Sequence, residues 1–250
     1  MKRVLALLAL FFLTGARDPI LVPDVSQHYI EIGHDFNGTA LLLFGAILSP
    51  EGTRAAQDYD IVVVLEGPTR PIVLRQKSRV AGIWINADSA TFRSAPSFYA
   101  VASARPLDQI VDDRTAAIYE LGLRALQLSP SDSIDPGAQA RFSSGLVDLM
   151  TRSGLYHQDG HAVTVTGQVL YQARIFLPSS VPIGNYTAET FAISHGRVVA
   201  SAISHVEVRK LGMDLAITDF AQHSAFLYGL LAVTISVVMG WVAGRFFPLV

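Results

Sequence analysis

Four basic residues lie close together in the chain and could bind negative charge: Arg70, Arg75, Lys77 and Arg79. The last three alternate with neutral residues, and alternate side chains of a β-strand project from the same face of a sheet. Such a row can meet an anion, anionic lipid headgroups or the acidic surface of a partner. The simpler interpretation, which the pattern favours, is the solvated face of a half-buried strand. These four residues are nevertheless the candidate patch for an anion or a partner.

Two histidines, His157 and His161, have a spacing that would place both on one face of a helix, where they could hold a metal ion. Asp159 and Gly160 lie between them, however, and this segment is typical of a loop. No glutamate follows the first histidine as it does in metalloproteases. We therefore predict solvated loop histidines and no metal site.

Motifs of nucleophilic catalysis and of nucleotide binding are missing from the sequence. It has no Gly-x-Ser-x-Gly elbow, no Ser-x-x-Lys pair and no glycine-rich phosphate loop, and it has no cysteine. We therefore predict no catalytic residue and no cofactor, and we classify the chain as a non-enzyme. An envelope enzyme whose site is assembled only by the fold is the alternative.

Residues 225–244 carry no charge. Twenty helical residues at about 1.5 Å each span the roughly 30 Å hydrocarbon core of a bilayer, so this segment predicts a transmembrane helix. Small residues recur every four positions along it, at Ala232, Ser236, Gly240 and Gly244. Such a stripe lets a second helix approach closely, which predicts packing against another copy of the chain or another membrane protein. The alternative is that small residues are simply common in membrane helices.

The N-terminal residues have the three parts of a secretory signal. Lys2 and Arg3 precede an apolar run over 4–13, and small residues follow at 14–16. The run is too short to span a bilayer, so residues 1–16 predict a signal peptide, with an uncleaved signal anchor as the alternative. We therefore expect a bacterial inner-membrane protein with a periplasmic domain over 17–210 and a cytoplasmic tail over 245–250.

The exported part reads as mainly β, with helices in the middle. Short runs rich in valine, isoleucine and aromatic residues predict strands over 27–32, 39–48, 60–66, 71–79, 83–85, 98–103, 162–166, 168–177, 186–194 and 197–209. Helical spacing appears over 106–128 and 138–149. We predict an immunoglobulin-like β-sandwich with a helical insertion at about 105–150 and a juxtamembrane helix over 211–224. Two small β domains are the alternative.

The predicted core of the first strands consists of Leu41, Leu43, Ile61, Val63, Ile72, Leu74 and Trp84. Trp84 would be the central aromatic residue of the sandwich, and a partner-binding surface around it is the other interpretation. The formal net charge of −2 argues against nucleic-acid binding.

Several segments resemble a known family: 58–64 with 66–68, 80–86, 96–103, the turn Pro182-x-Gly184-x-Tyr186, and 227–232. The chain is similar there to an uncharacterised alphaproteobacterial family of single-span transmembrane proteins, and the likeness covers nearly the whole mature chain. The family brings no known activity, so no catalytic residues carry over. The resemblance associates the chain with exporters of the sulfite or anion type, and it implies a role as a periplasmic accessory to such a transporter.

These observations predict a non-catalytic accessory or binding protein. Its expected partners are the lipid bilayer and a membrane protein or second copy that packs on the transmembrane helix.

Overall fold

The computed structural model describes residues 19–33, 35–48, 59–131, 134–167, 169–210 and 220–246. These residues divide into two compact units. The first runs to Val208 without Glu31–Asp35, and the second consists of Glu31–Asp35 and the chain from Arg209 onward. The predicted signal peptide lies outside the described residues, as do residues 211–219 of the predicted juxtamembrane helix and residues 247–250 of the predicted tail.

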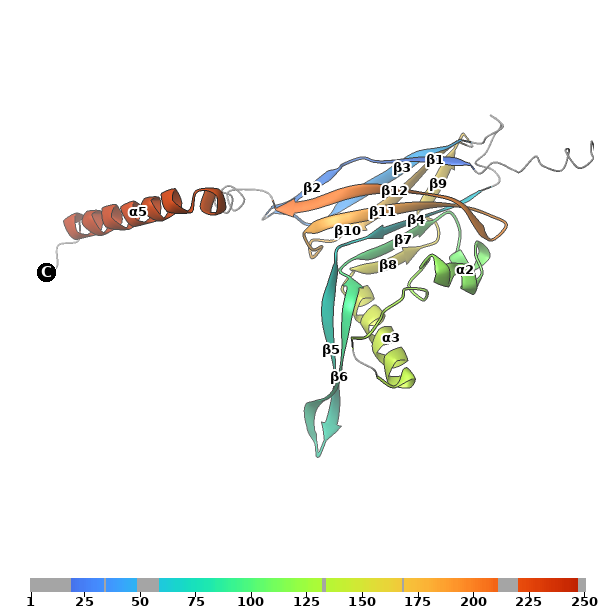
Figure 1. Cartoon of the computed structure of the whole chain (residues 1–250), viewed down its shortest axis with the longest axis horizontal. Helices are drawn as coiled ribbons and strands as arrows, with labels where there is room; N and C mark the ends of the chain where they lie inside the picture. Colours follow the sequence, from blue (N-terminus) through green and yellow to red (C-terminus); the bar gives the residue numbers. More distant parts are fainter. Residues whose placement is uncertain are drawn as a thin grey trace, which may run out of the picture. The chain divides into compact units, whose positions relative to one another are not determined.

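Two sheets form the body of the first unit (Figure 1). The smaller sheet has the order β1 (Ile20–Val25), β3 (Thr39–Leu48), β10 (Leu170–Leu177), β9 (Val163–Thr166). The larger sheet has the order β2 (Tyr29–Ile32), β12 (Arg197–Lys210), β11 (Gly184–Ser194), β4 (Asp60–Glu66), β7 (Tyr99–Ser103), β8 (Tyr156–Asp159). The pair β7–β8 is parallel, whereas β4 is antiparallel to both of its neighbours.

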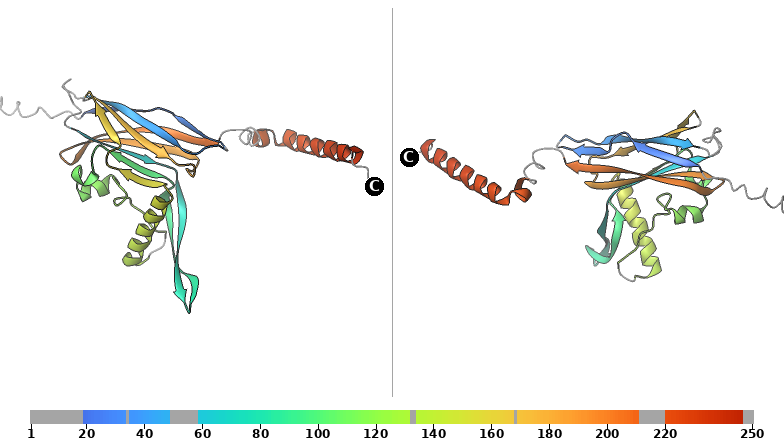
Figure 2. Two further views of the ribbon diagram at one scale, coloured as in Figure 1. Left: turned by 180° about the vertical axis from the view of Figure 1, so that it is seen from behind. Right: turned by 45° about the horizontal axis from the view of Figure 1, so that its top comes forward.

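The core lies between these two sheets, which pack face to face (Figure 2). Strand β10 alternates strictly between exposed and buried residues, as expected for a strand with one solvated face. Strand β4 is buried on both faces from Ile61 to Leu65. Four predicted core residues are confirmed as buried: Leu41, Leu43, Ile61 and Val63. The chain is therefore a mainly β protein, and the more specific immunoglobulin-like description stays a prediction.

The helical part lies between β7 and β8. It consists of a 3-10 turn, η2 (Leu107–Gln109), and the helices α2 (Asp113–Ile118) and α3 (Pro136–Arg152). Asp135 caps α3 by accepting hydrogen bonds from the backbone N–H groups of Gly137 and Ala138, at 2.9 and 3.2 Å. The helix predicted over 138–149 is thus confirmed.

The prediction of one helix over 106–128 was wrong for most of that range. Helix α2 ends at Ile118, and Glu120 and Gly122 then have φ angles of 51° and 106°. A backbone in the left-handed region cannot continue a right-handed helix, so the chain turns away here.

Strands β5 (Thr69–Val80) and β6 (Ile83–Pro96) form a separate two-stranded sheet, here named the arm, which projects from the sandwich (Figure 1). Ala81 and Gly82 connect the strands with φ angles of 49° and 86°, as in a type I′ hairpin turn. Twelve residues at roughly 3.3 Å each give the arm a length of about 40 Å.

The placement of Trp84 in the core was wrong, because its side chain is 66% exposed. The outer half of the arm extends beyond the sandwich, and no other described part of the chain forms a second layer over the two-stranded sheet there. Ile72 and Leu74, also predicted as core, lie in the inner half and are half-buried.

The inner half of the arm is held by α3 and by the segment before it. The side chain of Phe92, opposite Ile72 on the neighbouring strand, is fully buried. The backbone N–H of Ser131 donates to the carbonyl of Thr91 at 2.6 Å, and Arg93 donates to the carbonyl of Ser131 at 3.0 Å. Figures 1 and 2 show α3 running beside this half. The arm is therefore supported at its base and free at its end.

The second unit contains helix α5 (Ala225–Phe246). Its residues Ala225–Gly244 have a mean hydropathy of 2.0 and none is buried, so among the described residues this is the one helix long and apolar enough to cross a membrane. The predicted apolar helix at 225–244 is confirmed. In the same unit, Arg209 forms an ion pair with Glu31 at 2.7 Å.

Candidate functional site

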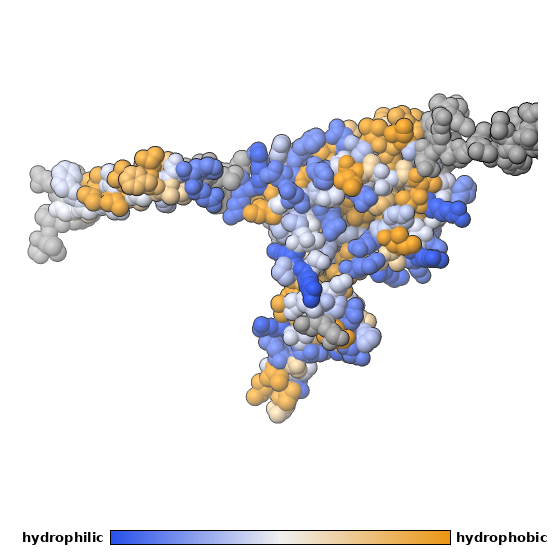
Figure 3. Space-filling view, viewed as in Figure 1, coloured by the Kyte–Doolittle hydropathy of each residue, from blue (hydrophilic) through white to orange (hydrophobic). Residues whose placement is uncertain are grey.

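The outer end of the arm, here named the tip and defined as Val80–Ile85, exposes large apolar side chains. Ile83 and Trp84 are 68% and 66% exposed, and Val80 and Ile85 are exposed as well. Hydrophobic residues gather at this end in the space-filling view (Figure 3). Clustered apolar side chains at the end of a projecting hairpin do not serve the core, and such clusters mark contact sites.

The four basic candidates do not form one patch. Arg75, Lys77 and Arg79 lie in the outer half of β5 and are exposed, next to the tip. Arg70 lies at the base of the arm opposite Ala95, roughly 30 Å along the strand from Arg79. The sequence correctly predicted a strand that carries these basic residues, but only three of the four lie next to the tip.

Arg70 has a different environment, close to two buried tyrosines. Burial raises the pKa values of Tyr156 and Tyr186, and the positive charge of Arg70 acts in the opposite direction on both. Arg70 therefore belongs to the junction of the arm with the sandwich.

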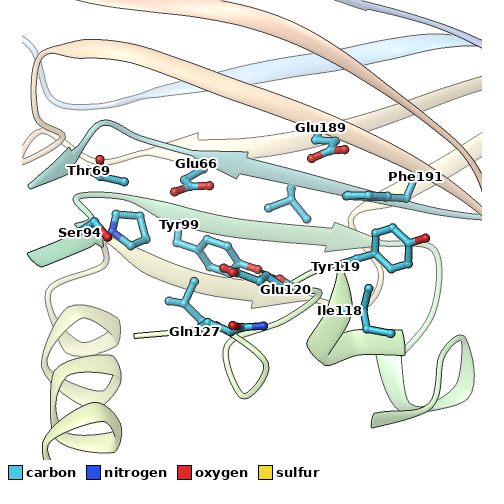
Figure 4. Close-up of a pocket in the computed structure, with 13 residues that line it drawn as sticks. Glu66, Thr69, Ser94, Tyr99, Ile118, Tyr119, Glu120, Gln127, Glu189 and Phe191 are labelled. Atoms are coloured by element: carbon cyan, nitrogen blue, oxygen red, sulfur yellow. Dashed lines mark hydrogen bonds between the residues drawn. The ribbon is translucent and has the colours of Figure 1, made fainter. Parts of the chain in front are cut away.

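A pocket of about 420 Å³ lies between β4, β11 and the segment after α2, and it is here named the acidic pocket. Glu66, Glu120 and Glu189 line it together with the rings of Tyr99, Tyr119 and Phe191. Figure 4 shows these side chains around a common space. Sequence reasoning missed the pocket, because its three glutamates come from distant parts of the chain and belong to no motif.

Electrostatics and hydrogen bonds define the inner wall of the acidic pocket. Burial raises the pKa of Glu66, and the negative charges of Glu120 and Glu189 raise it further. The hydroxyl of Tyr99 donates to the carbonyl of Glu120 and accepts from the backbone N–H of Gly122 at 3.2 Å. These bonds fix the turn at Glu120, whose left-handed backbone would otherwise be unfavourable.

The chemistry of the acidic pocket suits a positively charged group. Carboxylates in a partly dry site attract cations and repel anions, and aromatic ring faces add to that attraction. Tyr119 and Phe191 meet edge to face at a centroid distance of 5.8 Å. Among the described residues, no histidine, lysine or arginine lines the pocket. Among the residues that the structure describes, no group of three histidine, aspartate or glutamate side chains could hold a metal ion.

Glu66→Gln is expected to stabilise the protein at neutral pH. The pKa of Glu66 is higher in the folded than in the unfolded chain, so folding opposes its ionisation, and this cost appears as the pH rises through the folded pKa. The advantage of the variant should shrink as the pH falls through that pKa. Thermal unfolding followed by circular dichroism in detergent across this range measures it. Glu207→Gln, on the exposed side of β12, controls for loss of one negative charge. An advantage that grows toward acidic pH would contradict the prediction.

Comparison with known proteins identifies a family for the chain. Residues 20–248 match the model of the family described as "Putative transmembrane protein (Alph_Pro_TM)". The chain belongs to this family. A comparison with curated proteins found no match. The family's description and the apolar helix α5 both indicate that the chain is located in a membrane.

In this family member, the predicted small-residue stripe lies on α5 and is open. The hydroxyl of Ser236 donates to the carbonyl of Ala232 at 2.9 Å, which satisfies it within the helix. A methyl group added at Gly240 or at Gly244 would meet no atom within 4 Å. The stripe is thus accessible along its length, and its packing against a second helix stays a prediction.

The histidines His157 and His161 lie in different local structures. His157 lies in strand β8 rather than in the loop expected from the sequence, and its ring packs against Phe98 at a centroid distance of 5.6 Å. Burial lowers its pKa, which favours the neutral ring. The backbone N–H of His161 donates to the carboxylate of Asp159 at 2.8 Å in the following turn.

Proposed function

We propose that the chain is a membrane-anchored, non-catalytic accessory protein that displays an immunoglobulin-like domain in the periplasm and binds a membrane partner. The arm is the observation that carries this proposal. A hairpin about 40 Å long, supported at its base and apolar at its free end, has an outer half that lies outside the core and is suited to reach another surface. Such an element serves binding rather than chemistry.

The anchor supplies a second contact. Helix α5 exposes its stripe of small residues, and a partner helix packed there would gain close backbone contact. By resemblance, the partner is a transporter of the anion or sulfite-exporter type, and a second copy of the chain is the other candidate. In this arrangement the signal peptide exports the domain across the bacterial inner membrane, and the C-terminus stays in the cytoplasm.

The non-catalytic part of the proposal is supported by the lining of the acidic pocket. A serine or threonine nucleophile is commonly activated by a histidine, and Ser94 and Thr69 line the pocket without a histidine among its described lining residues. The hydroxyl of Tyr99 is engaged by the backbone at Glu120 and Gly122. The pocket is therefore better suited to hold a cationic group than to activate a nucleophile.

Crosslinking and affinity purification from native membranes test the proposed partnership. The doubly substituted chain Gly240→Leu, Gly244→Leu should recover roughly tenfold less partner than the native chain, because leucine at both positions keeps a second helix at a distance. The matched control is Val238→Leu, Val242→Leu, which adds bulk on the opposite side of α5. Equal recovery by both doubly substituted chains would refute the helix contact.

A further inference from the structure

We infer that the tip of the arm inserts into the headgroup region of an anionic lipid bilayer. The inference rests on the proposed function, since it names the surface that the arm contacts. The observations that carry it are the exposed apolar side chains of the tip, the basic residues directly behind them and the support at the base of the arm.

The apolar side chains of the tip are of the kind that bilayer interfaces take up. Val80, Ile83 and Ile85 are neighbours of Trp84 in the hairpin, and all four are exposed to solvent. Tryptophan favours the headgroup level of a membrane, because its ring is largely apolar and its N–H can remain hydrogen-bonded. Branched aliphatic side chains beside it gain from leaving water.

The charge distribution selects an anionic surface. Residues 70–87 contain Arg75, Lys77 and Arg79 next to the tip and no acidic residue. The first carboxylate on the returning strand is Asp88, which lies opposite Gln76 and is 3.9 Å from Arg141 of α3. A cation close to an anionic bilayer strengthens binding about fivefold. A tip without acidic residues and with three cations behind it complements lipid phosphates.

The backbone of the arm sets the depth of insertion. A two-stranded sheet leaves outward N–H and C=O groups on both edges, and these cannot enter the hydrocarbon core without partners. At the end itself, the strands close through Ala81 and Gly82, and Arg79 donates to the carbonyl of Gly82 at 3.2 Å. The tip is therefore suited to a shallow position among headgroups, roughly 5–10 Å deep.

The base of the arm presents the tip in a fixed direction from the sandwich. Phe92 is buried there, and Ser131 bonds to both strand β6 and the side chain of Arg93. Less conformational freedom is lost when a supported hairpin binds than when a mobile loop does.

Fluorescence of Trp84 in the full-length chain tests the inference. The chain has two tryptophans, so Trp241→Phe leaves Trp84 as the single reporter. This variant is reconstituted into vesicles of phosphatidylcholine alone or mixed with phosphatidylglycerol. Lipids brominated on the acyl chain quench a ring within the membrane, and iodide quenches one in water. With phosphatidylglycerol, Trp84 should shift to shorter emission wavelength, gain quenching by the brominated lipid and lose quenching by iodide.

Matched variants separate the contributions of charge and apolar surface. In the Trp241→Phe background, Arg75→Gln with Lys77→Gln should lower the lipid-quenched fraction in mixed vesicles several-fold. Ile83→Ser with Ile85→Ser should do the same. Val73→Ser changes an exposed apolar residue in the inner half of β5 and should leave the signal unaltered. Equal unfolding temperatures of all variants confirm that the fold is intact.

Emission that stays exposed to iodide in both vesicle types would overturn the inference, and so would quenching that is independent of phosphatidylglycerol. In either case, a photo-crosslinker placed at Ile85 in native membranes shows whether only the lipid inference fails or the proposed function fails with it. A specific protein adduct would preserve the proposed function and replace the lipid by a protein partner. The absence of any adduct would overturn both.

Discussion

Gly45→Val is expected to destabilise the sandwich by about 3 kcal/mol or more. Gly45 is a buried residue of β3, opposite Pro23 of β1 and Tyr171 of β10. A methyl group added there would overlap the carbonyl oxygen of Val22 and lie 2.6 Å from the hydroxyl oxygen of Tyr171. The carbonyl belongs to a paired strand, and the buried tyrosine ring has little space to retreat.

The free energy of unfolding, measured by urea denaturation of the full chain in detergent, tests this expectation. The matched control is Gly33→Val, because a methyl group added at Gly33 meets no atom within 4 Å. The control should change the free energy by less than about 0.5 kcal/mol. If both variants unfold at the same urea concentration, the close approach of β3 to Tyr171 is not a constraint on the fold.

Leu146→Ala is expected to cost roughly 2–5 kcal/mol of stability. Leu146 is fully buried on the inner side of α3, together with Phe142 and Met150. Truncation leaves a cavity that the helix cannot close without moving. Because α3 lies beside the inner half of the arm, the variant should also increase hydrogen exchange of the arm's backbone amides.

The same helix offers the control, Leu149→Ala, whose side chain is 53% exposed. It removes the same atoms from the same helix and should cost less than about 0.5 kcal/mol, with unchanged exchange in the arm. Equal losses for the two variants would show that α3 does not pack through the face containing Leu146.

Local pattern was sufficient for the elements whose own residues already carry a clear period or turn. The apolar run of α5 and the alternation in β10 are visible in the sequence, and so is the turn His195-Gly196 between β11 and β12, whose φ angles are 51° and 79°. In these cases composition and period decide the structure, whatever packs against it.

The arm was not predictable in the same way. Ile83, Trp84 and Ile85 have the composition of a buried strand, and they are exposed because no other part of the described chain covers the outer arm. The acidic pocket escaped prediction for a related reason. Glu66, Glu120 and Glu189 meet only because β4 and β11 are neighbours and the chain turns back after α2. Burial and convergence are properties of the fold, which no local pattern contains.

The way in which the arm joins the sandwich leaves the length of the arm free to vary. Strand β4 ends at Glu66 and β7 begins at Tyr99, its direct partner. The hydrogen-bonded ladder then continues into the arm. The backbone N–H of Gly67 donates to the carbonyl of Phe98 at 2.8 Å, and that of Ser97 donates to the carbonyl of Pro68 at 3.0 Å. The next pair is Thr69 and Pro96, the first of the arm. The arm is thus an elongated hairpin between two neighbouring strands. Residues can be inserted or deleted in pairs, one on each strand of its outer half, without shifting the register of the sandwich. Reach is therefore a property that evolution can adjust separately from the body of the domain.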